Sequence, residues 1–290
     1  MMDDMQPPPP AILSGPTQPT CPIVISIPHA GRYYSPELLS VARVSASTLQ
    51  RLEDRYVDLL AKGLGAQGYR VIAATHARAW IDLNRGEDEW DSSLISGGHS
   101  PPHAGRYTRA GLGVIPRRLH DVGDLWRRRF THAELMARIE GIHRPYHAVV
   151  AEALAAAASL YGRAVLIDLH SMPRQPGGSP QIVLGDRHGL TATSRLVERL
   201  MATGEGMGYR VARNAPYAGA HTIEHHAQKL SGRRWRIEAV QVEVDRSLYL
   251  DTAMEPCAEA VSRMADVVER VAAAASAYVK GNHFFVQAAE

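Results

Sequence analysis

Two histidines stand directly after segments whose composition predicts buried β-strands. His29 follows the apolar run I-V-I-S-I at 23–27, and His170 follows A-V-L-I-D-L at 164–169. Ligands in open α/β sheets collect at the carboxyl ends of strands. Two neutral imidazoles and one carboxylate bind zinc in hydrolytic sites and leave a position open for water. His29 and His170 are therefore candidate metal ligands, with a structural role as the alternative for each histidine taken singly.

Three acidic residues in one predicted helix are candidates for the carboxylate ligand. Glu53, Asp54 and Asp58 fall within 47–67, where leucines recur at three and four residues as an amphipathic helix requires. On such a helix Asp54 and Asp58 share one face. The pattern leaves the choice among the three acids open, because an ordinary solvated helix face explains any one of them equally well.

One glutamate is a candidate general base because of its place in a predicted strand. In the segment 236–244, strand alternation sends Glu243 to the face opposite Val242 and Val244. A partly buried carboxylate with a raised pKa is well suited to take a proton from water. If the strand lies exposed at the edge of a sheet, the same alternation carries no functional meaning.

A basic side chain and an amide side chain also follow a predicted strand, at 79–83. Arg85 presents a planar fork of donors beside Asn84, and such a fork binds a carboxylate through two parallel hydrogen bonds. The pair is therefore a candidate clamp for a substrate carboxylate. A surface salt bridge is the competing explanation for Arg85.

Strands and helices alternate along the chain, which predicts a three-layer α/β fold with helices on both faces of a sheet. Further strands are expected at 70–74, 181–184 and 209–213, and helices at 131–161, 191–203 and 253–279. Pro145 is expected to break or kink the first of these helices. Residues 1–20 are proline-rich and predict a flexible tail, and 21–290 shows no linker, which predicts a single domain.

Composition excludes several classes of protein. The chain has 290 residues, and its 32 basic and 30 acidic side chains nearly cancel, which argues against a dedicated nucleic-acid binder. No apolar segment reaches the ~20 residues that cross a bilayer, so no membrane span is expected. The two cysteines, Cys21 and Cys257, are far apart and suggest neither a disulfide nor a cysteine metal site. A cytoplasmic protein is expected, and the sequence leaves a homo-oligomer open.

Nine short fragments appear in an order that resembles the N-formylglutamate amidohydrolase family over about residues 21–255. The fragments are Pro28-His29-Ala30-Gly31, Asp54 in D-R-Y-V-D-L-L, Asp82-Leu83-Asn84-Arg85, Gly111-Leu112-Gly113-Val114-Ile115-Pro116, Arg144-Pro145-Tyr146-His147, Asp168-Leu169-His170-Ser171-Met172-Pro173, Leu184-Gly185-Asp186-Arg187, Asn214-Ala215-Pro216-Tyr217 and Gln241-Val242-Glu243. The family is itself similar to zinc carboxypeptidases and to the aspartoacylase group, which also uses D-L-N-R. The resemblance implies a phosphorylase/hydrolase-like fold, one divalent metal, expected to be zinc, and hydrolysis of an acyl-amino-acid amide.

The resemblance also implies roles for individual residues. It makes His29 and His170 metal ligands and Glu243 the general base, and it makes Asn84 with Arg85 the clamp for a substrate carboxylate. The carboxypeptidase H-x-x-E spacing would place glutamate where this chain has Arg32, so the acidic ligand must come from elsewhere, and Asp54 is the choice.

The implied reaction converts N-formyl-L-glutamate and water to formate and L-glutamate, a step of histidine breakdown in this family. Arg246 is expected to offset a second substrate carboxylate beside Arg85. Where the family has P-Y-x-G-G-Y, this chain has alanine and histidine in the last two places, so Tyr217 and His221 are expected to affect substrate fit. The alternatives are the same hydrolysis of another N-acyl-amino acid or short peptide and, more distantly, a non-catalytic carboxylate-binding protein.

Overall fold

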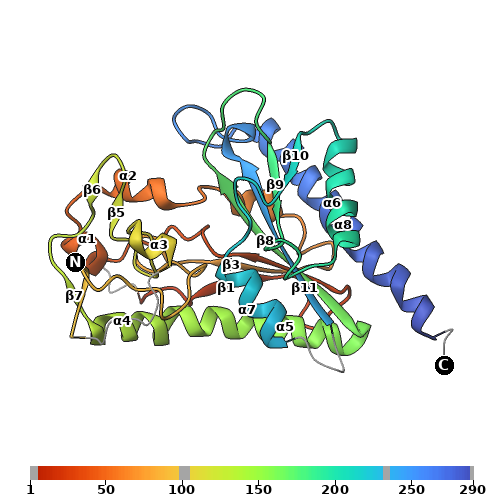
Figure 1. Cartoon of the computed structure of the whole chain (residues 1–290), viewed down its shortest axis with the longest axis horizontal. Coiled ribbons are helices and arrows are strands. Elements are labelled where there is room, and N and C mark those ends of the chain that lie inside the picture. The colour runs from red at the N-terminus through yellow and green to blue at the C-terminus, as the bar shows by residue number, and fades with distance from the viewer. Residues whose placement is uncertain (1–5, 98–104, 231–235, 288–290) are drawn as a thin grey trace. The chain divides into compact units, whose positions relative to one another are not determined.

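The computed structural model describes residues 6–97, 105–230 and 236–287, and Figure 1 shows how their helices and strands are arranged. Across these residues the main sheet has seven strands in the order β1-β3-β2-β8-β11-β9-β10. Their bounds are Ala11–Ser14 (β1), Ile23–Ile27 (β2), Arg70–Ala74 (β3), Arg163–Met172 (β8), Ile182–Gly185 (β9), Val211–Arg213 (β10) and Arg236–Asp245 (β11). The sheet is mixed, because β9 runs antiparallel to β11 while β2, β8 and β11 are parallel.

Helices cover both faces of this sheet, as the alternating pattern predicted. Figure 1 shows α6 (Ser194–Gly206) and α8 (Ala258–Gln287) on one side and α5 (Arg144–Tyr161) with α7 (His221–Leu230) on the other. On β11, Glu238 accepts a hydrogen bond from the hydroxyl of Tyr278 in α8. Strand alternation then places the odd-numbered residues of β11 on the opposite face. The predicted α/β fold class is confirmed.

The two central strands carry the candidate site residues. The strands β8 and β11 pair in parallel over ten residues each, and this register sets Glu243 beside His170. Nearly every residue of both strands is buried, as expected of strands covered on two faces. Because β11 lies between β8 and β9, it is a central strand, and the edge-strand alternative for Glu243 is ruled out.

The remaining elements are short. Small two-stranded sheets join β4 (Ile95–Ser96) to β7 (Phe130–Thr131) and β5 (Arg118–Leu119) to β6 (Gly123–Asp124). The other helices and helical turns are α1 (Pro36–Val41), α2 (Ala46–Leu49), η1 (Gln50–Leu52), η2 (Val57–Ala61), α3 (Arg106–Arg109), α4 (His132–Arg138), η3 (Ile139–His143) and η4 (Arg246–Leu248).

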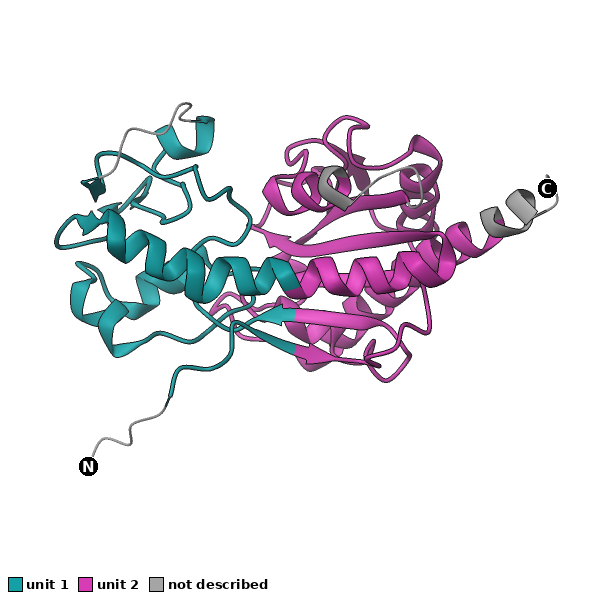
Figure 2. Ribbon diagram, turned by 90° about the horizontal axis from the view of Figure 1, so that it is seen from below, with its two compact units in different colours: residues 1–12, 28–53, 73–148 teal, residues 13–27, 54–72, 149–290 magenta. Residues whose placement is uncertain are grey.

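The chain divides into two compact units, coloured separately in Figure 2. Unit 1 is made of residues 1–12, 28–53 and 73–148, and unit 2 of residues 13–27, 54–72 and 149–290. Unit 2 holds the buried central strands, and unit 1 holds the two small sheets. The sequence predicted one domain over 21–290. A division of this kind leaves no linker to find, because each unit is assembled from three separate segments of the chain.

The structure differs from the prediction of a flexible tail over residues 1–20. Within the described part of that stretch, β1 forms the edge strand of the main sheet. Thr75 donates its backbone N–H to the carbonyl of Pro10 at 3.2 Å and its hydroxyl to the carbonyl of Pro9 at 2.5 Å. Proline cannot donate a backbone hydrogen bond, but its carbonyl still accepts one, which is enough at a sheet edge. Residues 1–5 lie outside the described residues.

The strand predicted at 79–83 is absent, and its residues form turns instead. The backbone N–H of Trp80 and that of Ile81 both donate to the carbonyl of Ala77. The backbone N–H of Asp82 then reaches the carbonyl of Val114 at 2.8 Å. The apolar side chains are buried as the pattern required, but consecutive turns rather than a strand bury them.

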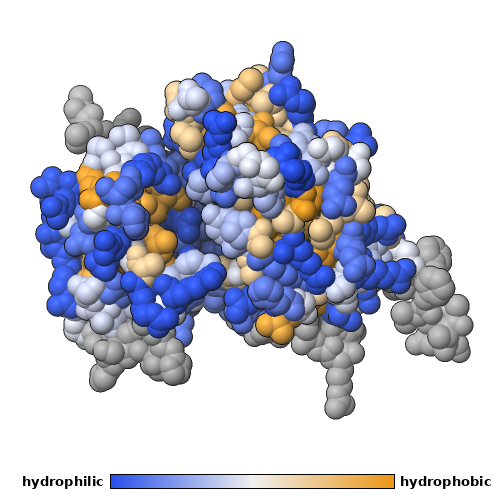
Figure 3. Space-filling model, turned by 45° about the horizontal axis from the view of Figure 1, so that its top comes forward, coloured by the Kyte–Doolittle hydropathy of each residue, from blue (hydrophilic) through white to orange (hydrophobic). Residues whose placement is uncertain are grey.

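No helix in the described part of the chain is long and apolar enough to cross a membrane. The face shown in Figure 3 is mostly hydrophilic, with apolar side chains in small patches. Among these residues, two neighbouring exposed apolar side chains come from β1, Ile12 and Leu13, and the other large ones are scattered along the chain: Leu39, Val122, Leu160 and Leu190.

Candidate active site

His170 lies buried near the end of β8, between two carboxylates. Its Nδ1 is 2.8 Å from Oδ2 of Asp54, and its Nε2 is 2.9 Å from Oδ2 of Asp168. Asp168 is held in turn by Ser26, whose hydroxyl donates to Oδ1 at 2.8 Å. Ser26 is directly opposite Asp168 in the parallel pairing of β2 with β8. Asp168 and Ser26 on two neighbouring strands, together with Asp54, therefore fix the orientation of the imidazole ring.

The charges around His170 favour its protonated form. Burial opposes the charged ring, but the carboxylates of Asp168, Asp54 and Glu243 outweigh that cost and hold the pKa of His170 well above its ordinary value. A buried group of three carboxylates needs a positive charge nearby. A proton on His170 supplies one such charge, and a bound cation supplies another.

Asp54 does not lie on a helix, in contrast to the prediction for 47–67. The predicted helix breaks into α2, η1 and η2, with Glu53 extended and Tyr56 in the left-handed region at φ 59°. The turn is held by unit 2 itself, because Tyr249 donates its hydroxyl to the carbonyl of Arg55 at 2.9 Å. The leucine spacing predicted the buried side but carried no information about this anchor.

The three candidate acids are placed differently. Glu53 accepts a hydrogen bond from the hydroxyl of Tyr34 at 2.5 Å, and Asp58 lies half-buried in η2. Of the three, Asp54 is the acid that contacts His170, since its Oδ2 lies 2.8 Å from Nδ1 of that ring within unit 2.

His29 occupies the loop that follows β2, and a carboxylate also holds its ring. Its Nε2 is 2.7 Å from Oδ1 of Asp82. Arg78 donates Nε to Oδ2 of Asp82 at 2.9 Å, and the backbone N–H of Asn84 donates to Oδ1 at 2.9 Å. Burial alone would raise the pKa of Asp82, but Arg78, His29 and Arg85 outweigh this cost and hold that pKa well below its usual range. The loop is tight at Gly31, where an added Cβ would lie 1.9 Å from the carbonyl oxygen of His76.

His29 in unit 1 and the contacting pair of Asp54 and His170 in unit 2 are all residue types that bind metal ions. All three side chains are buried, and two imidazoles with one carboxylate are a typical donor set for a divalent ion. Metal-binding histidines usually have their second nitrogen fixed by a carboxylate or carbonyl, and Asp82 and Asp168 provide this here. Within unit 1, His143 and His147 are two further buried histidines of a type that binds metal, and their ring centres are 4.5 Å apart.

Glu243 projects from the centre of β11 beside His170. It is 7% exposed, and the side-chain amide of Gln241 donates to its Oε1 at 2.8 Å. Gln241 and Glu243 are two residues apart and share a face of the strand. A buried carboxylate one strand away from a candidate metal ligand is well placed for proton transfer.

Arg85 is buried, and most of its guanidinium is already committed to backbone carbonyls. Its Nη1 donates to the carbonyl of Asn84 at 2.6 Å and its Nε to that of Leu112 at 2.9 Å. The guanidinium carbon lies 4.1 Å from the centre of the Tyr107 ring. Within the described residues Nη2 makes no hydrogen bond. Arg85 is therefore held rigidly with one donor edge to spare.

A profile of the N-formylglutamate amidohydrolase family matches residues 21–250 of this chain. The chain belongs to the N-formylglutamate amidohydrolase family. It is 30% identical over 245 residues to an N-formylglutamate deformylase of Pseudomonas aeruginosa, covering 79% of this chain and 82% of that protein. A second N-formylglutamate deformylase, from Pseudomonas putida, is 30% identical over 242 residues, with the same coverage.

Solved structures show the same relationship. The crystal structure of N-formylglutamate amidohydrolase from Ralstonia eutropha JMP134 matches with a TM-score of 0.84 and 30% sequence identity, covering 94% of this chain and 99% of that chain. A gene product from Agrobacterium tumefaciens matches with a TM-score of 0.65 and 17% identity, covering 93% of this chain and 95% of that one, and shows the shared fold.

The other residues expected to contact substrate are more dispersed in this member of the N-formylglutamate amidohydrolase family. Arg246 donates Nη2 to the carbonyl of Ser171 at 3.0 Å and lies 3.5 Å from Oδ1 of Asp54. Tyr217 lies half-buried in the loop before α7, and His221 begins α7 with its ring 5.0 Å from that of His225. Arg246 is thus bound beside a candidate metal ligand.

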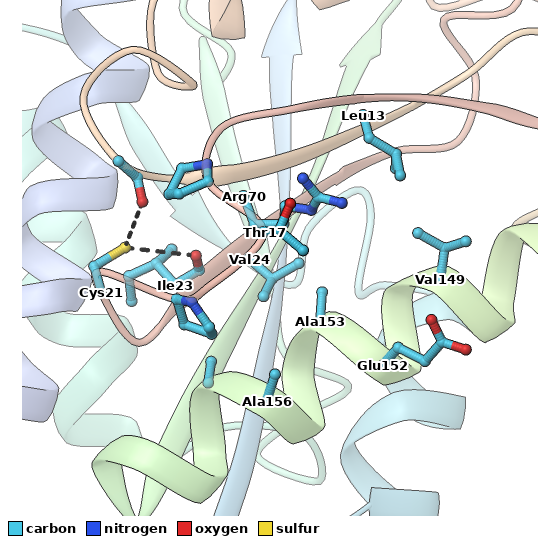
Figure 4. A pocket seen from close by; sticks show the side chains of 14 residues that line it. Leu13, Thr17, Cys21, Ile23, Val24, Arg70, Val149, Glu152, Ala153 and Ala156 are labelled. Atoms are coloured by element: carbon cyan, nitrogen blue, oxygen red, sulfur yellow. Dashed lines mark hydrogen bonds between the residues drawn. The ribbon is translucent and has the colours of Figure 1, made fainter.

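Two cavities within unit 2 lie apart from these residues. One of about 230 Å³ is lined by Ile23 and Arg70, the first residues of β2 and β3, so it is at the opposite strand ends from His170 (Figure 4). Cys21 lines it, and burial raises the pKa of this thiol, which keeps it protonated. The other, of about 550 Å³, lies beyond the carboxyl ends of β8 and β11 and is lined by Arg174 and Asp245 among others.

Asp82 and Asp168 both lie in the sequence fragments typical of the N-formylglutamate amidohydrolases, but the sequence alone predicted no role for either of them. A signal for Asp168 exists in D-L-H, because residues two apart on a strand share a face and the acid is then beside the ring of His170. No comparable signal exists for Asp82. It meets His29 only through folding of the loops, 53 positions away along the chain.

Proposed function

We propose that this chain is a metal-dependent amidohydrolase that converts N-formyl-L-glutamate and water to L-glutamate and formate. Membership of the N-formylglutamate amidohydrolase family supports the reaction class and the substrate. The observation that carries the proposal is the neighbourhood of His170, which contacts Asp54 and lies on the strand next to that of the buried carboxylate of Glu243.

We propose that His29, Asp54 and His170 together hold one divalent ion, with zinc as the expected metal. The donor set and the carboxylates behind both rings support this assignment. When bound, such an ion supplies Lewis acidity at the scissile carbonyl and lowers the pKa of a water molecule toward neutrality.

The chain's own residues then bind the substrate and move the protons. Glu243 takes a proton from water and passes one to the nitrogen of the leaving amine, which leaves as L-glutamate. Arg85 binds one substrate carboxylate through its remaining donor edge, with Asn84 beside it. Arg246 offsets the second carboxylate, and Tyr217 and His221 shape the substrate side of the site.

Two further properties follow as proposals. Cys21 and Cys257 are both free cysteines, which supports a reducing cytoplasm as the place of action. The near balance of 32 basic and 30 acidic side chains supports a small-molecule substrate over a nucleic-acid partner.

Formate release is the measurement that tests the reaction. Purified protein is assayed with N-formyl-L-glutamate as isolated, after chelation, and after zinc is restored. We expect release to disappear on chelation and to return with zinc. As a control, His188→Asn alters an exposed histidine and should leave all three results unchanged.

A substrate panel separates the proposed reaction from its alternatives. N-formyl-L-aspartate, N-acetyl-L-glutamate and short peptides are compared at equal concentration. Faster turnover of one of these would assign the chain to another N-acyl-amino acid, an alternative that the replaced residues near Tyr217 favour. Binding of the panel without any turnover by the zinc-loaded protein would indicate a carboxylate-binding protein.

A further inference from the structure

Two buried histidines hold the backbone of the segment that contains Arg85. Nε2 of His147 lies 2.8 Å from the carbonyl oxygen of Leu83, and Nε2 of His143 lies 2.8 Å from that of Arg85. A carbonyl oxygen only accepts hydrogen bonds, so each Nε2 must carry the hydrogen and donate it. The two side chains are 2% and 5% exposed for His143 and His147. Both ends of Leu83–Arg85 are thus tied to two successive turns of helix, η3 and the start of α5.

His143 and His147 lie on the same side of that helix because they are four residues apart, and an irregular turn ends at His143. A π-helical turn, η3, joins α4 to α5 and comes directly before Arg144 and Pro145. In a regular helix the proline ring would collide with the carbonyl four residues earlier, and a wider turn relieves this conflict. Single π-helical turns inside α-helices occur frequently at functional sites. The ring centres of His143 and His147 are 4.5 Å apart.

The segment that these histidines hold determines where the Arg85 guanidinium lies. Two of the guanidinium nitrogens donate to backbone carbonyls, and one of those carbonyls belongs to Asn84, inside the tied segment. A shift of the backbone at 83–85 therefore moves the remaining donor edge. Burial lowers the pKa of His143, which keeps the ring neutral. A neutral ring has a single N–H, and here that hydrogen is committed to the carbonyl of Arg85.

We propose that His143 and His147 are positioning residues that fix Arg85 in advance for a substrate carboxylate. The inference rests on the proposed role of Arg85 and extends the site to residues that touch neither metal nor substrate. Preorganisation of this kind improves binding because less motion has to be frozen when the ligand arrives.

Kinetic variants test whether the two histidines act through Arg85. We expect His143→Ala and His147→Ala each to raise KM for N-formyl-L-glutamate roughly ten-fold, the size of one lost hydrogen bond, while kcat stays within about two-fold. His143→Gln retains an N–H donor and should recover most of the loss. In an Arg85→Lys background, His143→Ala should add little, because residues that act as one unit are not additive. Additive losses, or a fall in kcat with KM unchanged, would overturn the proposal.

Two measurements do not depend on turnover. Calorimetric binding of L-glutamate to the zinc-loaded protein should weaken roughly ten-fold in His143→Ala, in step with KM. Hydrogen–deuterium exchange of the peptide 82–86 should accelerate in the same variant, while peptides of β8 stay unchanged. Unchanged exchange would mean that the histidines do not hold the segment. Faster exchange with unchanged glutamate binding would mean that they do so for stability alone, and either result overturns the proposal.

Metal analysis tests whether His143 and His147 bind a metal directly, because both are buried histidines of a type that can do so. Both alanine variants should keep the wild-type metal content, and a lost equivalent would make them ligands instead. If the wild type releases no formate from N-formyl-L-glutamate but glutamate binding and exchange respond as expected, the proposed substrate is wrong and the positioning role stands.

Discussion

The two histidines expected to bind metal are supported by different means. The His29 arm consists of His29, Asp82 and Arg78, which lie in loops and end in a cation. The His170 arm consists of His170, Asp168 and Ser26, which lie in neighbouring strands and end in a hydroxyl. Both aspartates are completely buried. A loop lacks the ladder of hydrogen bonds that fixes a strand, so the loop arm relies on an ion pair where the strand arm relies on the sheet.

The arms also differ in charge. In the His29 arm, Arg78 balances Asp82. In the His170 arm, the carboxylates of Asp168, Asp54 and Glu243 all act on the same ring, and Arg246 approaches Asp54 at a longer distance, 3.5 Å. The His170 arm therefore depends more strongly on a bound cation, and removal of that cation should disturb it first.

Each arm continues into a different part of the proposed chemistry. Asp82 also receives the backbone N–H of Asn84, so the His29 arm leads to the carboxylate clamp. His170 is beside Glu243 in the register of β8 and β11, so the His170 arm leads to the base. The comparison predicts that damage to the first arm chiefly affects binding and damage to the second chiefly affects turnover.

The largest effect is expected when a metal ligand is removed from either arm. His170→Ala and His29→Ala should each lose bound metal and, with it, formate release, because two remaining donors hold a divalent ion poorly. Elemental analysis of purified protein checks this, with His188→Asn as the control. A full equivalent of metal retained in either variant would remove that arm from the ligand set. A comparison of Glu53→Ala with Asp54→Ala identifies the acidic ligand in the same way, because only the variant that lacks the ligand should lose metal.

Glu243→Gln should give the next largest effect, because it keeps the shape of the side chain but removes the proton acceptor. We expect kcat to fall about 10²–10⁴-fold with metal content and KM little changed. Steady-state kinetics with parallel metal analysis measure both. Near-normal turnover with metal and fold intact would place the base elsewhere.

Asp168→Asn and Asp82→Asn compare the arms directly. Loss of the carboxylate behind a metal-binding histidine typically lowers metal affinity about 10–100-fold. We expect the loss of metal affinity in Asp168→Asn to approach the upper end of this range, about 100-fold, because the His170 arm holds more negative charge. Asp82→Asn should instead lose more stability, about 1–3 kcal/mol in the free energy of unfolding, because Arg78 is left without its carboxylate. Competition with a chelator and denaturant unfolding give the two quantities, and the reverse ranking would contradict the charge argument.

Arg85→Lys tests whether the His29 arm leads to substrate binding. Lysine keeps the charge but cannot donate to the carbonyls of Asn84 and Leu112 in the same geometry. A lost charge-assisted contact of about 1.5–3 kcal/mol corresponds to roughly ten- to a hundred-fold in affinity. KM should rise by this factor with kcat largely kept. Unchanged KM and kcat would place Arg85 outside the site.

Local sequence patterns predicted most strands of the main sheet, but in each arm they singled out only the histidine. The runs 23–27 and 70–74 match β2 and β3 to the residue, because a buried strand leaves a continuous apolar signature. The same patterns missed the break at Glu53–Tyr56 and made a strand of 79–83. Contacts with residues far along the chain decide these places, and a local pattern does not record such contacts.

The candidate residues follow the same division. His170 and Glu243 were found from strand position alone, because adjacent strands place them together whatever the loops do. Asp54 needed the family resemblance, since its turn is anchored by Tyr249 from the other end of the chain. Asp82, His143 and His147 drew no separate prediction, because their partners are backbone and side-chain groups brought together only by loop folding.

The smallest effect is expected at the outer end of each arm, where Ser26 and Arg78 act on metal only through an aspartate and a histidine. Ser26→Ala removes one neutral donor from Asp168, which the sheet still holds in place, so metal affinity should fall only roughly two- to fivefold. Arg78→Gln removes the charge that balances Asp82 in a loop, and a loss of about ten-fold is expected there. Both variants are measured by chelator competition under identical conditions. Equal losses would show that the cation and the hydroxyl are interchangeable, and the distinction between a loop arm held by charge and a strand arm held by the sheet would have to be abandoned.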